Sequence, residues 1–421
     1  MKNSVARKLK QVPVGYLVVG VDPHKKKHAA VAINEDLVVQ TKFKFANSKD
    51  GFDEALEKAR AEMIKAGCRG VMFAIETGGH FWRNLAYFLE ERGIPFRLIS
   101  QFTLKRMRDG RDLNRRKNDF RDAEMAAGVL RTGDFTETKL PQGVYAELRG
   151  THSAYYRLVK ERSRIINLMK GLLDGLFPEF TQVFKNPCGL TALSVLYICP
   201  SPAAIASMNE DVFMDLIRSR QQRRLMRKKL CALHQVARTS IGVKPGADAV
   251  ATEVTLLVGR YNLIEQQVDG LVRSLIKLVE KTEEGKYLLS IPGISYLSAA
   301  ALLAELGSFR LYHNAKQLIK MAGTNPIESE SGGKRLGKTP MSKKGRPRLR
   351  YSAWSAVIPL FRHNPDFRAW AKRLRERPAH ANPLNGKEVV GAALNRLLRL
   401  VYTLVKKQEF YRSPRLVLVA N

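Results

Sequence analysis

The stretch that most constrains this chain is residues 16–34, YLVVGVDPHKKKHAAVAIN. Its first residues are almost all apolar or β-branched, which is typical of a strand buried on both faces of a sheet. The strand ends in a carboxylate at Asp22, and a basic turn then leads to a second predicted strand that begins at His28. A carboxylate at such a place is expensive to desolvate. Asp22 therefore either caps a turn or serves as a metal ligand held rigidly by a central strand.

A second apolar segment, GVMFAIE at residues 70–76, also ends in an acid, Glu76. Around these two segments, strand-like alternation and helical periodicity follow one another along the chain. The pattern predicts strands over 16–22, 28–34, 37–45, 70–76 and 95–100 and helices over 48–66 and 80–91. Strands that alternate with helices indicate an α/β layer structure with a partly parallel sheet.

Two more acids open the apolar helix predicted next, DFRDAEMAAGVL. Asp119 and Asp122 are three residues apart, so they face the same side of that helix. Acids in a first helical turn also suit the helix dipole without any further role. In order with Asp22 and Glu76, however, they form a set of four carboxylates. Two divalent ions about 3.5–4 Å apart require such a set to converge, and Mg²⁺ prefers carboxylate, water and phosphate oxygens.

The charge of the chain indicates a polyanionic partner. There are 72 Lys and Arg residues against 39 Asp and Glu, a formal net charge of +33 and a pI of about 10.2. Nucleic acid is the usual partner of so basic a chain, although some ribosomal and membrane-surface proteins share this balance. Dense basic runs favour contact with a nucleic-acid backbone over a merely solvated surface. The predicted nucleic-acid-binding residues are Lys105, Arg106, Arg108, Arg115, Arg116, Arg223, Arg224, Arg227, Lys334, Arg335, Lys343 and Lys344.

The cysteines and the apolar segments indicate in which cellular compartment the protein works. The four cysteines are scattered, with no C-x-x-C pair and no spacing suited to zinc. This usage argues against structural disulfides and suits a reducing cytoplasm. The first residues lack the apolar core of a signal peptide, and no apolar run reaches the roughly 18 residues of a membrane span. We therefore expect a cytoplasmic protein without membrane association.

Two long helices are predicted over residues 144–177 and 252–281. In the second, apolar residues recur at steps of three and four from Val254 to Leu278, which is typical of a coiled-coil seam. The partner of this seam is either the first long helix, folded back as an antiparallel hairpin, or a second chain. Between the two helices, RSRQQRRLMRKK at residues 218–229 predicts a single basic helix.

The last third of the chain holds two further motifs. The sequence IPGI at 291–294, before a small-residue helix, resembles the turn of a helix-hairpin-helix, which can offer backbone N–H groups to a phosphate. It is otherwise an ordinary helix–helix turn. Downstream, Ser329 and Ser331 precede a Gly-Gly pair and several basic residues. That segment is either a flexible basic loop or the site of a nucleophilic serine, where the backbone can approach a phosphate closely.

These motifs together resemble one family, the transposases of the IS110 and IS1111 insertion-sequence group, which are bridge-RNA-guided recombinases. The N-terminal motifs are VGVD at 19–22, IETGG at 75–79 and KNDFRDAEMAA at 117–127. The C-terminal motifs are SIPGISYLSAAALLAELG at 290–307, AGTNP at 322–326, SGGKRLGK at 331–338 and SKKGRPRLR at 342–350. The resemblance covers both ends and the predicted coiled coil, whereas residues 185–245 look like an insertion. It divides the chain into domains at 1–143, 144–286 and 287–421.

The resemblance implies a fold, a chemistry and partners. The first domain would be RNase H-like (RuvC-like), with Asp22, Glu76, Asp119 and Asp122 binding two Mg²⁺ ions, for which Mn²⁺ could substitute. A mostly α-helical C-terminal domain would supply Ser331 as the nucleophile that forms a covalent phosphoserine link to DNA. A guide (bridge) RNA would pair with donor and target DNA. The protein would work as a homo-oligomer, a dimer or a tetramer, on the nucleoid of a prokaryotic cell.

Two other functions fit some of the same residues. A metal-dependent nuclease or Holliday-junction resolvase would use the four acids without serine chemistry. A non-enzymatic RNA- or DNA-binding scaffold would need neither the acids nor the serine. Substitution of Ser331 distinguishes the nuclease from the recombinase, because the nuclease would still cleave DNA without this serine. Substitution of Asp22 and Asp119 distinguishes the scaffold, whose activity would not change.

Overall fold

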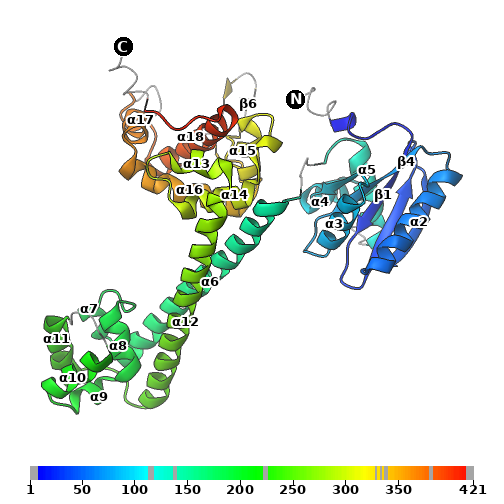
Figure 1. Cartoon of the computed structure of the whole chain (residues 1–421). Helices are drawn as coiled ribbons and strands as arrows, with labels where there is room; N and C mark the ends of the chain where they lie inside the picture. Colours follow the sequence, from blue (N-terminus) through cyan, green and yellow to red (C-terminus); the bar gives the residue numbers. More distant parts are fainter. Residues whose placement is uncertain are drawn as a thin grey trace. The chain divides into compact units, whose positions relative to one another are not determined.

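The structure is a computed structural model, and it describes residues 8–111, 118–135, 140–220, 226–327, 330–331, 334–335, 340–378 and 383–413. Two compact units make up the chain, Met1–Leu140 and Pro141–Asn421. The first is a mixed α/β unit and the second is mostly helical (Figure 1), so the predicted α/β region and helical remainder are confirmed. No helix among the described residues is long and apolar enough to cross a membrane.

A five-stranded mixed sheet forms the centre of the first unit, in the order β3-β2-β1-β4-β5. β1 and β2 are antiparallel, as are β2 and β3, whereas β1, β4 and β5 are parallel. The predicted partly parallel sheet is thus observed, with strand ends shifted by one or two residues. The strands are β1 (Tyr16–Asp22), β2 (Lys27–Ile33), β3 (Val39–Ala46), β4 (Gly70–Glu76) and β5 (Phe96–Ile99).

Alternate residues of β1 supply two different cores, because successive side chains of a strand point to opposite faces. Leu17, Val19 and Val21 pack with helices α2 (Lys49–Lys65) and α3 (Trp82–Glu91). Val18 packs on the other face with α4 (Gln101–Arg111) and α5 (Asp119–Arg131). A strand covered on both faces has no polar side, which explains the continuous apolar run in the sequence.

Gly20 determines how closely α5 approaches the sheet. A Cβ atom at this position would lie 1.9 Å from the Ala123 carbonyl oxygen and 2.8 Å from the Ala127 nitrogen. The backbone of α5 therefore lies directly on β1, where any larger residue would collide with it. This contact sets the height of the first turn of α5 above the sheet.

The second unit is built around two long helices, α6 (Gly143–Leu176) and α12 (Ala247–Glu280). They lie side by side and run in opposite directions (Figure 1). Ion pairs join them across the contact: Arg162 Nη1 lies 2.7 Å from Glu265 Oε1, and Arg260 Nη2 lies 3.2 Å from Glu161 Oε1. Of the two partners proposed for the α12 seam, α6 is the one that contacts it within this chain.

Each end of this helix pair is embedded in a separate core. One core joins Ile165, Met169 and Val254 to five shorter helices between α6 and α12. These are α7 (Phe180–Val183), α8 (Leu190–Ile198), α9 (Pro202–Ala206), α10 (Glu210–Arg220) and α11 (Arg227–Arg238). The prediction of one basic helix over 218–229 is wrong, because Met226 is not helical (φ −85°, ψ 63°) and α11 starts after it.

The other core joins Leu148, Leu275 and Val279 to the C-terminal helices. They pack around α14 (Tyr296–Leu306) and α18 (Gly386–Lys407), and two short strands, β6 (Glu330–Ser331) and β7 (Lys334–Arg335), pair with each other. Gly293 in the IPGI turn has a φ of +96°, which favours glycine, and it lies against the backbone of Leu360. The helices are α13 (Glu283–Leu289), α14 (Tyr296–Leu306), the 3₁₀ helix η1 (Phe309–Leu311), α15 (Ala315–Ala322), α16 (Pro347–His363), α17 (Pro365–Arg375) and α18 (Gly386–Lys407).

The contact at Gly20 yields a stability prediction. Gly20→Ala should lower the free energy of unfolding of the first unit by about 1–3 kcal/mol, because the added methyl group forces α5 away from β1. Thermal unfolding of the full chain, followed by near-ultraviolet circular dichroism, measures the loss. Gly128→Ala in the same helix is the matched control, since its Cβ would meet nothing within 4 Å. It should be neutral or stabilising, and equal losses in both variants would contradict the packing explanation.

Candidate functional site

Two of the predicted acids end neighbouring parallel strands. Val21 of β1 is in register with Ile75 of β4, so Asp22 and Glu76 follow at adjacent positions along the same edge of the sheet. By the alternation of the strands both side chains face α5, the face that also holds Val18 and Met72. Both residues are buried, with exposed fractions of 7% and 6%.

The other two acids come from the first turn of α5. Asn118 caps this helix, with its side-chain oxygen accepting a hydrogen bond from the Phe120 N–H at 3.0 Å. Because Gly20 lets α5 lie on β1, the first turn reaches the strand end at Asp22. Asp122 is buried (2% exposed), whereas the Asp119 side chain is 40% exposed.

Three of the four acids meet in one place. Asp22, Glu76 and Asp122 each offer an oxygen, and these atoms all lie within 4.8 Å of one another. Asp119 belongs instead to a second group, with Asp22 and His24, that meets the same distance limit. The structure therefore brings the four predicted acids to one edge of the sheet, in two overlapping groups that share Asp22.

The buried carboxylates repel one another. Burial raises the pKa of Asp22 above its ordinary value, and the charges of Asp122 and Asp119 raise it further, while the nearby His24 lowers it. Arg108 on α4 offsets part of this charge, because its Nη2 donates a hydrogen bond of 2.6 Å to Asp122 Oδ1. A cluster of buried carboxylate oxygens whose charge is offset only in part fits a hard divalent cation such as Mg²⁺, which takes oxygen ligands.

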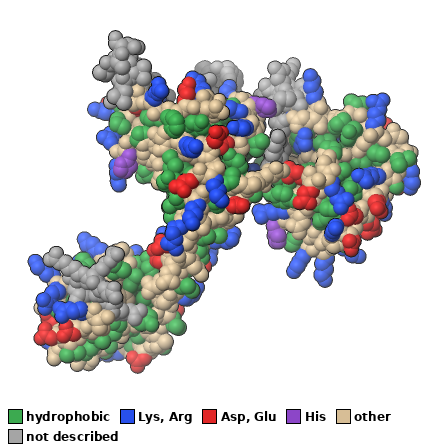
Figure 2. Space-filling view, viewed as in Figure 1, with side chains coloured by type: hydrophobic (Ala, Val, Ile, Leu, Met, Phe, Trp, Pro, Cys, Tyr) green, Lys and Arg blue, Asp and Glu red, His purple; other side chains and the backbone are tan. Residues whose placement is uncertain are grey.

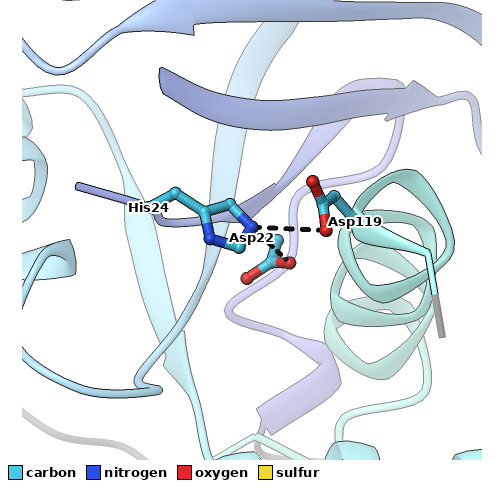
Figure 3. A group of neighbouring side chains, drawn as sticks. All are labelled: Asp22, His24 and Asp119. Atoms are coloured by element: carbon cyan, nitrogen blue, oxygen red, sulfur yellow. Dashed lines mark ion pairs between the residues drawn. The ribbon is translucent and has the colours of Figure 1, made fainter. Parts of the chain in front are cut away.

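His24 is the residue that sequence reasoning missed. Its Nε2 lies 3.2 Å from Asp22 Oδ2 and 3.4 Å from Asp119 Oδ1, between the two carboxylates (Figure 3). In the sequence, residues 23–27 (PHKKK) have the composition of a basic turn. The available signal was the position of a histidine two residues after an acid that ends a buried strand, since that spacing keeps it near the acid.

The predicted nucleic-acid-binding residues differ in their surroundings. Lys105 and Arg106 are exposed on α4, but Arg108 is only 23% exposed and pairs with Asp122. Its guanidinium is thus directed to the acid cluster, which spacing alone did not indicate. The remaining exposed members of the described set are Arg227 on α11 and Lys343 and Lys344 before α16.

The predicted nucleophile lies on a short hairpin. Ser331 of β6 pairs with Lys334 of β7, and Glu330 pairs with Arg335. The side chains of Ser331, Lys334 and Arg335 are outside the described part of the structure. Also outside the described residues are Ser329, Arg115, Arg116, Arg223 and Arg224.

Comparisons with known proteins point in one direction. A transposase model of the IS110 DEDD type matches residues 19–178, and a model described as the transposase IS116/IS110/IS902 family matches residues 285–372. A 44.8 kDa protein of insertion element IS116 from Streptomyces clavuligerus is 24% identical over 368 residues, 87% of this chain and 90% of the relative. The transposase for IS1111A from Coxiella burnetii is 25% identical over 360 residues, 83% of this chain and 80% of the relative.

The raised pKa of Asp22 predicts a stability effect with a definite sign. A carboxyl whose folded pKa is raised destabilises the fold as the pH rises through that pKa, and the effect vanishes below the pKa of the unfolded chain. In metal-free protein, Asp22→Asn should therefore raise the unfolding temperature of the first unit at pH 7. The gain should shrink as the pH is lowered toward 4, near the ordinary aspartate pKa of 3.8.

Calorimetry of the chelator-treated full chain tests this effect. Asp36→Asn is the control, because Asp36 is an exposed aspartate in the turn between β2 and β3 and should change little. Added Mg²⁺ should stabilise the wild type more than Asp22→Asn, since a ligand stabilises the state that binds it. A lower unfolding temperature for Asp22→Asn without metal would contradict the repulsion described above.

Proposed function

Since the chain belongs to the IS110 family of insertion-sequence transposases, we propose that it is an RNA-guided DNA recombinase that joins donor and target DNA through a phosphoserine intermediate. The observation that carries the proposal is the convergence of Asp22, Glu76 and Asp122 within 4.8 Å. Such a cluster is costly for folding and serves no packing purpose, so a role in DNA cleavage and rejoining accounts for it.

The first unit is proposed to have the RNase H-like fold. The strand order β3-β2-β1-β4-β5, with an antiparallel β2 and an acid as the last residue of both β1 and β4, supports this assignment. Asp22, Glu76, Asp119 and Asp122 are the proposed metal ligands, with Mg²⁺ as the metal and Mn²⁺ as a substitute. When bound, two such ions supply charge stabilisation at the attacking and departing oxygens of a phosphodiester.

Ser331 is the proposed nucleophile. Its hydroxyl oxygen forms a bond to phosphorus while the bond from phosphorus to one DNA sugar oxygen breaks. The proton lost by the hydroxyl ends on the departing sugar oxygen, and one phosphodiester is exchanged for another without an energy source. A serine hydroxyl is a weak nucleophile at its ordinary pKa, so it must be activated or the charge of the phosphate must be neutralised. Lys334 and Arg335, on the paired strand β7, are proposed to stabilise the charge on the phosphate.

The proposed partners are a guide RNA, donor DNA and target DNA, bound by a homo-oligomer. A net charge of +33 supports polyanionic partners, and basic side chains are spread over the face of the molecule shown in Figure 2. Base pairing would read the sequence while the protein holds the backbones, as in other RNA-guided systems. The helix pair α6 and α12 is proposed to be a coiled coil, within a three-domain division at 1–143, 144–286 and 287–421.

A metal-dependent nuclease or resolvase without serine chemistry is the second candidate. The observation that favours it is that the acid cluster lies wholly within the first unit, where the four acids form two overlapping groups at one sheet edge. The two functions differ in whether a covalent protein–DNA bond forms.

We expect a covalent adduct between the wild-type protein and nicked DNA in the presence of Mg²⁺ and the guide RNA. The adduct is detected as a band of reduced mobility on a denaturing gel. Ser331→Ala should abolish it, because no hydroxyl remains to hold the phosphate. The matched variant Ser329→Ala, two residues away, should retain it. Loss in Ser329→Ala alone would move the nucleophile to that residue, and DNA cleavage without any adduct would favour the nuclease.

The acids should be needed for strand cleavage. Asp122→Asn should reduce the cleavage rate by about a hundredfold or more, the loss typical of removing one preorganised group that stabilises developing charge. A single-turnover assay on labelled DNA measures it. Glu124→Gln, on the same helix with a half-exposed side chain paired to Lys42, is the control and should keep nearly full activity. Full cleavage activity in Asp122→Asn would rule out the proposed role of the acids in cleavage, whereas no cleavage even by the wild type would favour a binding scaffold.

A further inference from the structure

Two groups of potential ligands share Asp22 but differ in chemistry. Asp22, Glu76 and Asp122 offer only oxygen atoms, and all three residues are buried. Asp22, His24 and Asp119 offer two oxygens and one nitrogen, and His24 and Asp119 are half-exposed, at 42% and 40% of the side chain. Since each carboxylate has two oxygens, Asp22 can serve both groups at once.

The position of His24 is held by the backbone around it. Pro23 fixes φ immediately after Asp22, and the His24 N–H donates to Nδ1 of His28 at 3.0 Å. His28 is fully buried in β2, and its ring lies 5.0 Å from Phe45 and 5.7 Å from Phe52. The turn is thus anchored to the core of the first unit. His24 Nε2 is shielded from solvent although the ring as a whole is half-exposed.

One imidazole nitrogen cannot satisfy two carboxylates by hydrogen bonding. Nε2 carries at most one hydrogen, so it can donate to Asp22 or to Asp119 but not to both. In Figure 3 it points between the two carboxylates, which come from β1 and α5. A cation placed among the three groups would instead satisfy all of them together, because both carboxylates and the nitrogen lone pair are donors to a metal.

We propose that His24 Nε2 is a nitrogen ligand in a second divalent-metal subsite formed with Asp22 and Asp119, and that Asp22 bridges this subsite to the buried one. The inference rests on the proposed metal dependence of the acid cluster and assigns its outer position. An imidazole ligand suits Mn²⁺ better than Mg²⁺, which prefers oxygen alone. The outer subsite therefore binds Mn²⁺ more tightly than Mg²⁺, and the exposure of Asp119 leaves room for water and a DNA phosphate beside it.

Electron paramagnetic resonance of Mn²⁺ bound to the metal-depleted full chain tests the assignment. We expect two Mn²⁺ ions per chain and an electron-spin-echo modulation from a directly coordinated nitrogen. In wild-type protein with ¹⁵N-labelled histidine, the modulation should change to that of ¹⁵N, which identifies the ligand as a histidine without any variant. His24→Gln should abolish the modulation and weaken the second ion about tenfold or more, while the first remains.

Controls separate this inference from the proposed function. His313→Gln removes an exposed histidine of the other unit and should leave both ions and the modulation unchanged, whereas Asp22→Asn should weaken both ions. Two bound ions without nitrogen coupling in the wild type would overturn the role of His24 and leave the proposed function intact. The same holds if coupling persists in His24→Gln. Absence of Mn²⁺ binding to the wild type would overturn both.

Discussion

The backbone of α5 rests on β1 at Gly20, and the acid cluster depends on this contact. A side chain at that position would meet the Ala123 carbonyl oxygen at 1.9 Å, so the helix would have to move away from the sheet. With the contact in place, the first turn of α5 carries Asp119 and Asp122 to the edge where β1 ends in Asp22. Glu76 reaches the same edge because β4 runs parallel to β1 with matching register.

The cluster places unfavourable charge inside a well-packed unit. Asp22, Glu76 and Asp122 are each less than a tenth exposed, and Arg108 is the partner that the structure gives Asp122. His24 and Lys44 lie near Asp119, on the more exposed side of the acid cluster. Charge is therefore compensated from two directions, by an arginine on α4 and by basic residues around Asp119. Proteins keep such costly arrangements where function requires them.

The second unit follows a different physical principle. Its two long helices, α6 and α12, bury apolar residues against each other and end in two separate cores. The heptad spacing of α12 predicted a partner helix, but spacing is equally compatible with another chain. The ion pairs between Arg162 and Glu265 and between Arg260 and Glu161 belong to the contact made with α6. The helix break at Met226 was not predicted, because a basic run carries no apolar period that would mark where one helix ends.

Patterns within short segments of the sequence were sufficient to predict the strands and to single out the four acids as a candidate site. The continuous apolar runs that end at Asp22 and Glu76, and the spacing of Asp119 and Asp122, are properties of short segments, and their periodicity directly encodes which side chains share a face. The tertiary structure alone decided that Arg108 is directed to Asp122 and that His24 lies between Asp22 and Asp119. These contacts join residues on different elements, and their geometry depends on how α4, α5 and the turn after β1 pack, which no local pattern specifies.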